Sequence, residues 1–151
     1  LPAIRAGLRM KPMKILVPAL LVWLLATAAH AATTWDGVFS DAQAARGLEQ
    51  YLQHCSVCHA ASLEGNYASP PLVGRFMPDW AGSPLSDLYD YISSTMPLDR
   101  PGSLSAAAYA DIVAYLLKAN GFPSGPSELQ PGPGLAAIPF DIAPPQSGRV
   151  R

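Results

Sequence analysis

The chain has 151 residues, of which 50% are hydrophobic and 14% are charged. Its 10 basic and 11 acidic residues give a net charge of −1, but four of the basic residues lie within the first 14 positions. The remainder therefore holds six basic and 11 acidic residues, a net charge of −5. This excess of acidic residues excludes a basic surface for binding nucleic acid or an anionic membrane. It favours a neutral or basic protein partner.

Residues 1–31 have the pattern of a cleavable export signal. Four basic side chains precede an apolar run over residues 15–29, and Ala29-His30-Ala31 has the small-x-small form of a cleavage site. An apolar run of about 15 residues is short of the roughly 20 needed to span a bilayer. We therefore expect a periplasmic product beginning near Ala32, with membrane attachment only if the leader stays uncleaved.

The next segment, residues 32–121, is long enough for one small domain and shows no strand-like period, which predicts an all-α fold. A first helix is predicted to start at Ser40, a suitable N-cap. Gly47, Tyr51 and Cys55 recur at intervals of four residues and so line one face of it. Glycine costs about 1 kcal/mol relative to alanine inside a helix, so we expect another helix to approach closely there.

The first helix leads into the sequence Cys55-Ser56-Val57-Cys58-His59. This spacing is typical of covalent haem attachment, because each thiol adds to one vinyl group and the next histidine can bind the iron. A Cys-x-x-Cys pair also occurs in redox disulfides, zinc sites and structural bridges. The chain has no other cysteine, and no βαβ pattern surrounds the motif, so we favour haem. We expect His54 to be exposed and assign it no role.

Two more main helices are predicted after the motif, besides a short helical turn over residues 60–63. One starts at Ser83-Pro84, a cap followed by proline, and ends before Met96-Pro97. The other covers residues 105–120 and is the strongest in the chain, with a serine cap, an apolar stripe and a Gly-x-Pro stop. Its edge at Ile112 and Tyr115 is the expected partner of Gly47.

Two methionines follow the leader, and either could supply the second iron ligand. Met77 lies in a predicted loop only 18 residues past His59, near the proximal side of the haem. Met96 ends a helix and has enough chain to reach the opposite face. We therefore favour Met96, with Met77 or an open iron site as alternatives.

These features resemble the small single-haem cytochrome c family with His/Met ligation, over about residues 40–123. The stretch from Met96 to Ser105, with the one after Lys118, is similar to bacterial periplasmic cytochromes associated with quinoprotein dehydrogenases. The resemblance implies a cytochrome c-like fold of three main helices plus short turns around one haem. It also implies thioethers at Cys55 and Cys58 and axial bonds from His59 and Met96.

The same resemblance implies that a backbone carbonyl, most simply that of Pro70, accepts a hydrogen bond from His59. Such an acceptor fixes the orientation of the imidazole ring. The alternative interpretation of Pro70-Pro71 is a plain turn. Trp80, Tyr67 and Arg75 are candidates to contact the haem propionates, or else are general packing and surface residues.

The implied function is electron transfer rather than catalysis: a periplasmic one-electron carrier between a dehydrogenase, such as a quinoprotein, and an oxidase or another cytochrome. Two alternatives stay open. If Met96 does not bind, a five-coordinate iron could bind gas or peroxide. The chain could also be an obligate subunit of a dehydrogenase complex.

The last segment, residues 122–151, holds seven prolines and four glycines. This composition predicts a disordered tail with weak docking. A small apolar cluster (Leu135, Ile138, Phe140 and Ile142) could instead drape over the core or dock on a partner.

Overall fold

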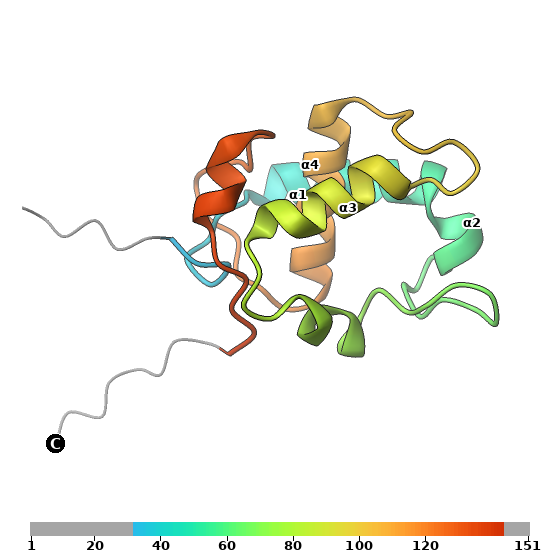
Figure 1. Ribbon diagram of the computed structural model, residues 1–151, viewed down its shortest axis with the longest axis horizontal. Coiled ribbons are helices and arrows are strands. Elements are labelled where there is room, and N and C mark those ends of the chain that lie inside the picture. Colours follow the sequence, from blue (N-terminus) through green and yellow to red (C-terminus); the bar gives the residue numbers. More distant parts are fainter. Residues whose placement is uncertain (1–31, 144–151) are drawn as a thin grey trace, which may run out of the picture.

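The computed structural model describes residues 32–143, so the predicted export signal lies outside the described residues. This part of the chain contains helices and two isolated β-bridges but no named strand, which confirms the all-α prediction. Figure 1 shows the elements, which in chain order are α1 (Asp41–His54), α2 (Ser56–His59), the 3₁₀ helix η1 (Gly74–Trp80), α3 (Leu85–Thr95), α4 (Ala106–Ala119) and the 3₁₀ helix η2 (Pro133–Ala137).

The fold is built on the crossing of α1 and α4, which form the most extensive helix contact in the molecule (Figure 1). At the crossing, a Cβ atom on Gly47 would overlap the carbonyl oxygen of Asp111 and crowd Tyr115. The close approach predicted at Gly47 is therefore present, with Asp111 rather than Ile112 beside Tyr115. The rings of Tyr51 and Tyr115 pack next to it, 5.3 Å between centroids.

Both long helices begin at the serines that the sequence indicated. The Ser40 hydroxyl accepts from the backbone N–H of Gln43 at 3.0 Å, and the Ser105 hydroxyl accepts from that of Ala108 at 3.2 Å. Each bond satisfies a donor that the first helical turn leaves unpaired. The two helices are thereby fixed at their N-terminal ends.

Three local predictions were wrong. Residues 60–63 form a turn rather than a helical turn, because Ala60 and Leu63 both have positive φ angles. Met77 lies in η1 rather than in an irregular loop. Helix α3 starts at Leu85 without a side-chain cap, so Ser83 does not cap it.

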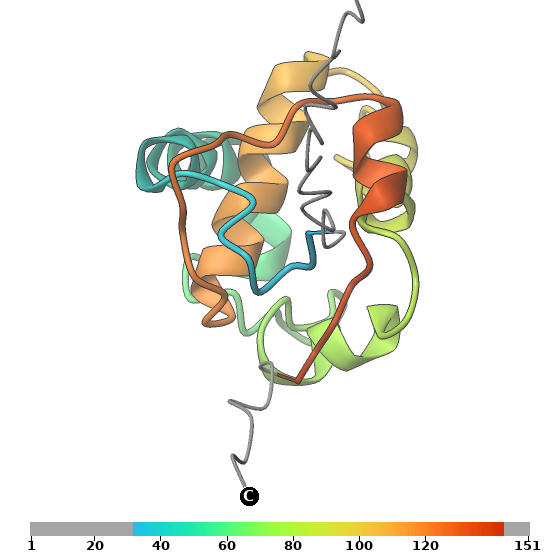
Figure 2. The same ribbon diagram turned by 90° about the vertical axis from the view of Figure 1, so that its left-hand side faces the viewer.

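The disorder predicted for residues 122–151 was also wrong over residues 122–143, here called the C-terminal segment, and residues 144–151 lie outside the described residues. Leu129, Leu135 and Phe140 are buried in the same core as the helices. Figure 2 shows the segment running around one face of the molecule, from the end of α4 to η2 beside α3. The Gln43 side-chain amide bonds both backbone groups of Leu129, at 2.9 and 2.8 Å. Of the predicted apolar cluster, Leu135 and Phe140 thus lie in the core and Ile138 packs against it, whereas Ile142 is exposed.

Within residues 32–143, no helix combines the length and the apolar character needed to cross a membrane.

Candidate haem site

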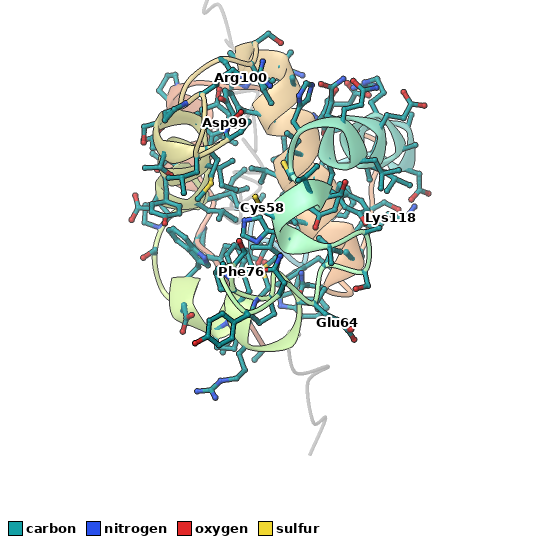
Figure 3. All side chains as sticks on the ribbon, turned by 90° about the vertical axis from the view of Figure 1, so that its right-hand side faces the viewer. Cys58, Glu64, Phe76, Asp99, Arg100 and Lys118 are labelled. Atoms are coloured by element: carbon teal, nitrogen blue, oxygen red, sulfur yellow. The ribbon has the colours of Figure 1, made fainter. Side chains whose placement is uncertain are left out.

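A single cavity of about 1290 Å³ gathers the chemistry-bearing residues. It is larger than the roughly 300–1,000 Å³ common for small-molecule pockets. Its walls come from α2 and the end of α1, from residues 68–72, from η1, and from α3 with the loop that follows it. Ile112 and Leu116 of α4 contribute apolar surface. Figure 3 views this side, with Cys58 near the middle, Phe76 below it, and Asp99 and Arg100 above.

The two thiols are presented one helical turn apart on the cavity wall. Cys55 caps the end of α1 through its N–H, which bonds the Tyr51 carbonyl at 2.8 Å, and α2 follows immediately. Cys55 is half-buried and Cys58 is exposed, and the two are not joined to each other. Burial, with a smaller contribution from Cys58, raises the pKa of the Cys55 thiol to about 11. Cys55 is therefore protonated at neutral pH.

His59 is buried, and its ring orientation is fixed by one backbone contact. The Nδ1 atom lies 2.9 Å from the carbonyl oxygen of Pro70. Because a carbonyl oxygen only accepts, Nδ1 is the donor, and Nε2 keeps the lone pair that a metal ligand needs. The contact suggested by the family resemblance is thus present between these atoms.

Two residues that the sequence analysis did not single out hold Pro70 in place. Gly65 has a φ of +70°, its N–H bonds the His59 carbonyl at 2.9 Å, and a Cβ there would overlap the Ser69 carbonyl. The Asn66 amide donates to the Cys58 carbonyl at 2.7 Å, and its oxygen accepts from Ala68 at 2.9 Å. The Gly-Asn pair was a visible turn signal, but its link to the haem motif is tertiary.

The two methionines differ in their relation to the cavity. Met96 is partly buried and lines it, directly after the end of α3. Met77 is buried in the apolar core, 4% exposed, and does not belong to the cavity lining. The structure thus brings Met96 together with Cys55, Cys58 and His59, whereas it places Met77 elsewhere.

The residues predicted to contact the haem propionates also differ in whether they line the cavity. Arg75 and Trp80 line the cavity, whereas Tyr67 is fully exposed and lies outside the lining. His54 also lines the cavity and is half-buried, so the expectation that it is exposed was wrong. Its Nδ1 atom is buried and has no hydrogen-bond partner in the described part of the chain.

The donor set fits a covalently held haem. One imidazole nitrogen is free for a metal, two thiols stand one turn apart, and a thioether lies on the same cavity. Much of the remaining lining is apolar, as a porphyrin face requires, with Leu72, Ile92, Ile112 and Leu116. Arg75, which also lines the cavity, would supply a positive charge for the haem propionates.

Residues 42–116 match the protein family described as "Cytochrome C oxidase, cbb3-type, subunit III". These residues are a domain of the cytochrome c family. This cytochrome domain is 32% identical over 79 residues to a "Thiosulfate dehydrogenase" of Stutzerimonas stutzeri (strain A1501), a match that covers 48% of this chain and 26% of that protein. The cytochrome thus spans about a quarter of that curated relative.

A solved structure is also similar to the cytochrome. It is titled "Crystal Structure of the Sulfane Dehydrogenase SoxCD from Paracoccus pantotrophus". The match has a TM-score of 0.45 and 26% sequence identity, and it covers 68% of this chain and 56% of the other.

Proposed function

We propose that this cytochrome is a one-electron carrier with a single haem c, held by thioethers at Cys55 and Cys58 and by axial bonds from His59 and Met96. The observation that carries the proposal is the cavity itself. It gathers both thiols, the free Nε2 of His59 and the Met96 side chain, while Met77 lies in the core away from it.

The residues of the cavity have three roles in this proposal: they attach the haem, bind its iron and set its reduction potential. Pro70 keeps the His59 ring in one tautomer and orientation, so that Nε2 faces the cavity. A haem bound here supplies reversible one-electron exchange, which needs no vacant coordination position. Met96 offers a soft, neutral sulfur, which stabilises the reduced state and raises the reduction potential. The apolar walls act in the same direction, because burial disfavours the additional positive charge of the oxidised centre.

We propose that the electrons come from a periplasmic dehydrogenase and leave to an oxidase or another cytochrome. The support is the export-signal pattern of residues 1–31 and the match to a relative named as a dehydrogenase. The resemblance to quinoprotein-associated cytochromes suggests a quinoprotein as donor, whereas the relative's name points to a thiosulfate dehydrogenase. A second candidate follows from the share of that relative that is matched: the cytochrome could be the electron-accepting part of a dehydrogenase complex.

The ligand set can be tested in protein produced in a host that matures c-type haem. Denaturing mass analysis should give the polypeptide plus one haem, and the oxidised spectrum should contain a sulfur-to-iron charge-transfer band. Met96→Ala should abolish that band and lower the reduction potential, because a sulfur ligand is lost.

Met77→Ala is the matched control, since it removes the same side chain from the core instead of the cavity. It should lower stability by about 2–5 kcal/mol and leave the band in place. A band that disappears in Met77→Ala and persists in Met96→Ala would contradict the assignment. A product with the mass of the bare polypeptide would contradict the proposal as a whole.

A further inference from the structure

Tyr109, in the first turn of α4, contacts both ends of the loop that carries Met96. Its side chain is 3% exposed. Its hydroxyl donates to the Met96 carbonyl oxygen at 2.7 Å and accepts from the Leu104 N–H at 3.3 Å. One oxygen atom therefore joins the first and last parts of the segment 96–104.

The element that carries this hydroxyl is well anchored. Helix α4 starts at the Ser105 cap and packs against α1 at the Gly47 notch. Its next turns supply Ile112 and Leu116 to the cavity wall. The position of Tyr109 relative to the cavity is thus set by the most extensively packed helix pair of the fold.

The loop itself makes mainly local hydrogen bonds. The Met96 N–H bonds the Ile92 carbonyl at 3.0 Å, the Arg100 N–H bonds the Pro97 carbonyl at 2.9 Å, and the Ser103 N–H bonds the Arg100 carbonyl at 3.2 Å. These bonds shape the loop but tie it only to itself and to the end of α3. Within residues 32–143, the Tyr109 hydroxyl makes the hydrogen bonds that join the backbone of this loop to a side chain of α4.

We propose that Tyr109 is a positioning residue for the Met96 ligand, an inference that rests on the proposed His/Met ligation. Its hydroxyl holds the backbone at Met96 so that the side chain stays directed at the cavity. Removing the hydroxyl leaves the Met96 carbonyl and the Leu104 N–H without this partner. The cost of such a loss corresponds to an increase of about ten-fold in the population with Met96 detached.

The test compares Tyr109→Phe with Tyr89→Phe in the haem-loaded full chain. Tyr89 is a matched control, because its hydroxyl donates from α3 to a backbone carbonyl of α4, that of Ala106 at 3.2 Å, rather than to the carbonyl of Met96. Titration of the oxidised protein with imidazole, followed through the sulfur-to-iron band, measures how readily the methionine is displaced.

In Tyr109→Phe, the apparent Kd for imidazole should fall about ten-fold, because the detached state is more populated. In Tyr89→Phe, the Kd should equal that of the wild type. Imidazole affinity in Tyr109→Phe equal to that of the wild type would overturn the positioning role. Equal changes in both variants would also overturn it, since that result indicates a general loosening of α3 against α4.

The spectrum and the imidazole titration of the wild type distinguish a failure of this inference from a failure of the proposed function. If the wild-type spectrum lacks the band and imidazole binds as tightly as in Met96→Ala, the ligation proposal and this inference both fail. If Tyr109→Phe does not accumulate, hydrogen exchange in the reduced wild type provides the test. Slow exchange of the Leu104 amide supports the bridge, and exchange at the rate of an open loop overturns it.

Discussion

Two buried tyrosine hydroxyls hold the backbone at the two proposed iron ligands. The Tyr51 hydroxyl donates to the carbonyl of Ala60, the residue after His59, at 2.6 Å, and Tyr109 does the same at Met96. Burial, with smaller contributions from Cys55 and Tyr115, raises the pKa of Tyr51 well above its usual range. The hydroxyl therefore remains a donor in alkaline solution.

The two cysteines should differ in reactivity before haem is attached. Cys58 is exposed, whereas the pKa of Cys55 is raised to about 11, and only the thiolate is a good nucleophile. In the haem-free folded chain, iodoacetamide at neutral pH should modify Cys58 well before Cys55. Modification of Cys55 should accelerate as the pH rises toward 11, measured by mass mapping of the two sites.

The control is the same chain in denaturant. Cys55 is then no longer buried, so both thiols should react at similar rates. Equal rates for Cys55 and Cys58 without denaturant would contradict the raised pKa of Cys55.

At the scale of elements, the helix that ends at Met96 depends on residues far along the chain. The Leu85 N–H at the start of α3 bonds the Ile138 carbonyl at 2.8 Å. Beside it, the Phe140 N–H bonds the Ser83 carbonyl at 2.8 Å, and the Gly82 N–H bonds the Phe140 carbonyl at 3.0 Å. The C-terminal segment thus supplies the cap that α3 lacks in its own sequence.

The contact between α1 and α4 provides a prediction at this scale. Gly47→Ala should lower the free energy of unfolding by about 1–3 kcal/mol, because the added methyl overlaps backbone across the helix contact. This range is the net loss that remains after the gain in helix propensity of about 1 kcal/mol is subtracted. Denaturant unfolding of the haem-loaded protein measures it.

Ala45→Gly is a useful comparison, since Ala45 is exposed on the same helix. It should cost only about 1 kcal/mol. A Gly47→Ala variant as stable as the wild type would show that the two helices can separate without loss.

At the scale of the whole molecule, one ion-pair cluster fastens the C-terminal segment to both long helices. Arg46 of α1 bonds Asp111 of α4 at 3.0 Å and Glu128 of the segment at 2.9 Å. The Ser40 hydroxyl donates to Glu128 at 3.1 Å. The hydrogen bond from Arg46, chiefly, holds the pKa of Glu128 below its usual value.

The sign of this shift predicts how stability depends on pH. A carboxylate whose pKa is lower in the folded state stabilises the fold above its unfolded pKa of about 4.3, and the contribution is lost as the pH falls through the folded value. The difference in Tm between the wild type and Glu128→Gln should therefore be largest near pH 6–7 and should shrink as the pH falls below about 4. The difference should be small, because these side chains are partly exposed.

Arg46→Gln gives the matched background, since Glu128→Gln should then have little effect at any pH. A Tm difference that is constant between pH 3 and 7 would contradict a role for this ion pair.

Much of the fold and of the site could be predicted because the signals are local. The serine caps and the haem motif each lie within a few residues of what they determine, and the spacing of Gly47 marks a notch on one face of a single helix. The packing of residues 122–143 could not be predicted, because it depends on contacts such as that between Gln43 and Leu129, 86 residues apart. The hydrogen bonds of Tyr109 to Met96 and Leu104 could not be predicted either, because the spacing of Tyr109 in its helix indicates only an ordinary core residue.

The cap that the C-terminal segment provides for α3 has a consequence for the order of assembly. A chain that emerges amino end first presents residues 55–59 long before residues 138–140. Haem could thus be attached at residues 55–59 before the hydrogen bonds from residues 138–140 to the start of α3, the helix that precedes Met96, have formed. The final geometry around the iron would then be reached only after residues 138–140 have emerged and contacted the start of α3.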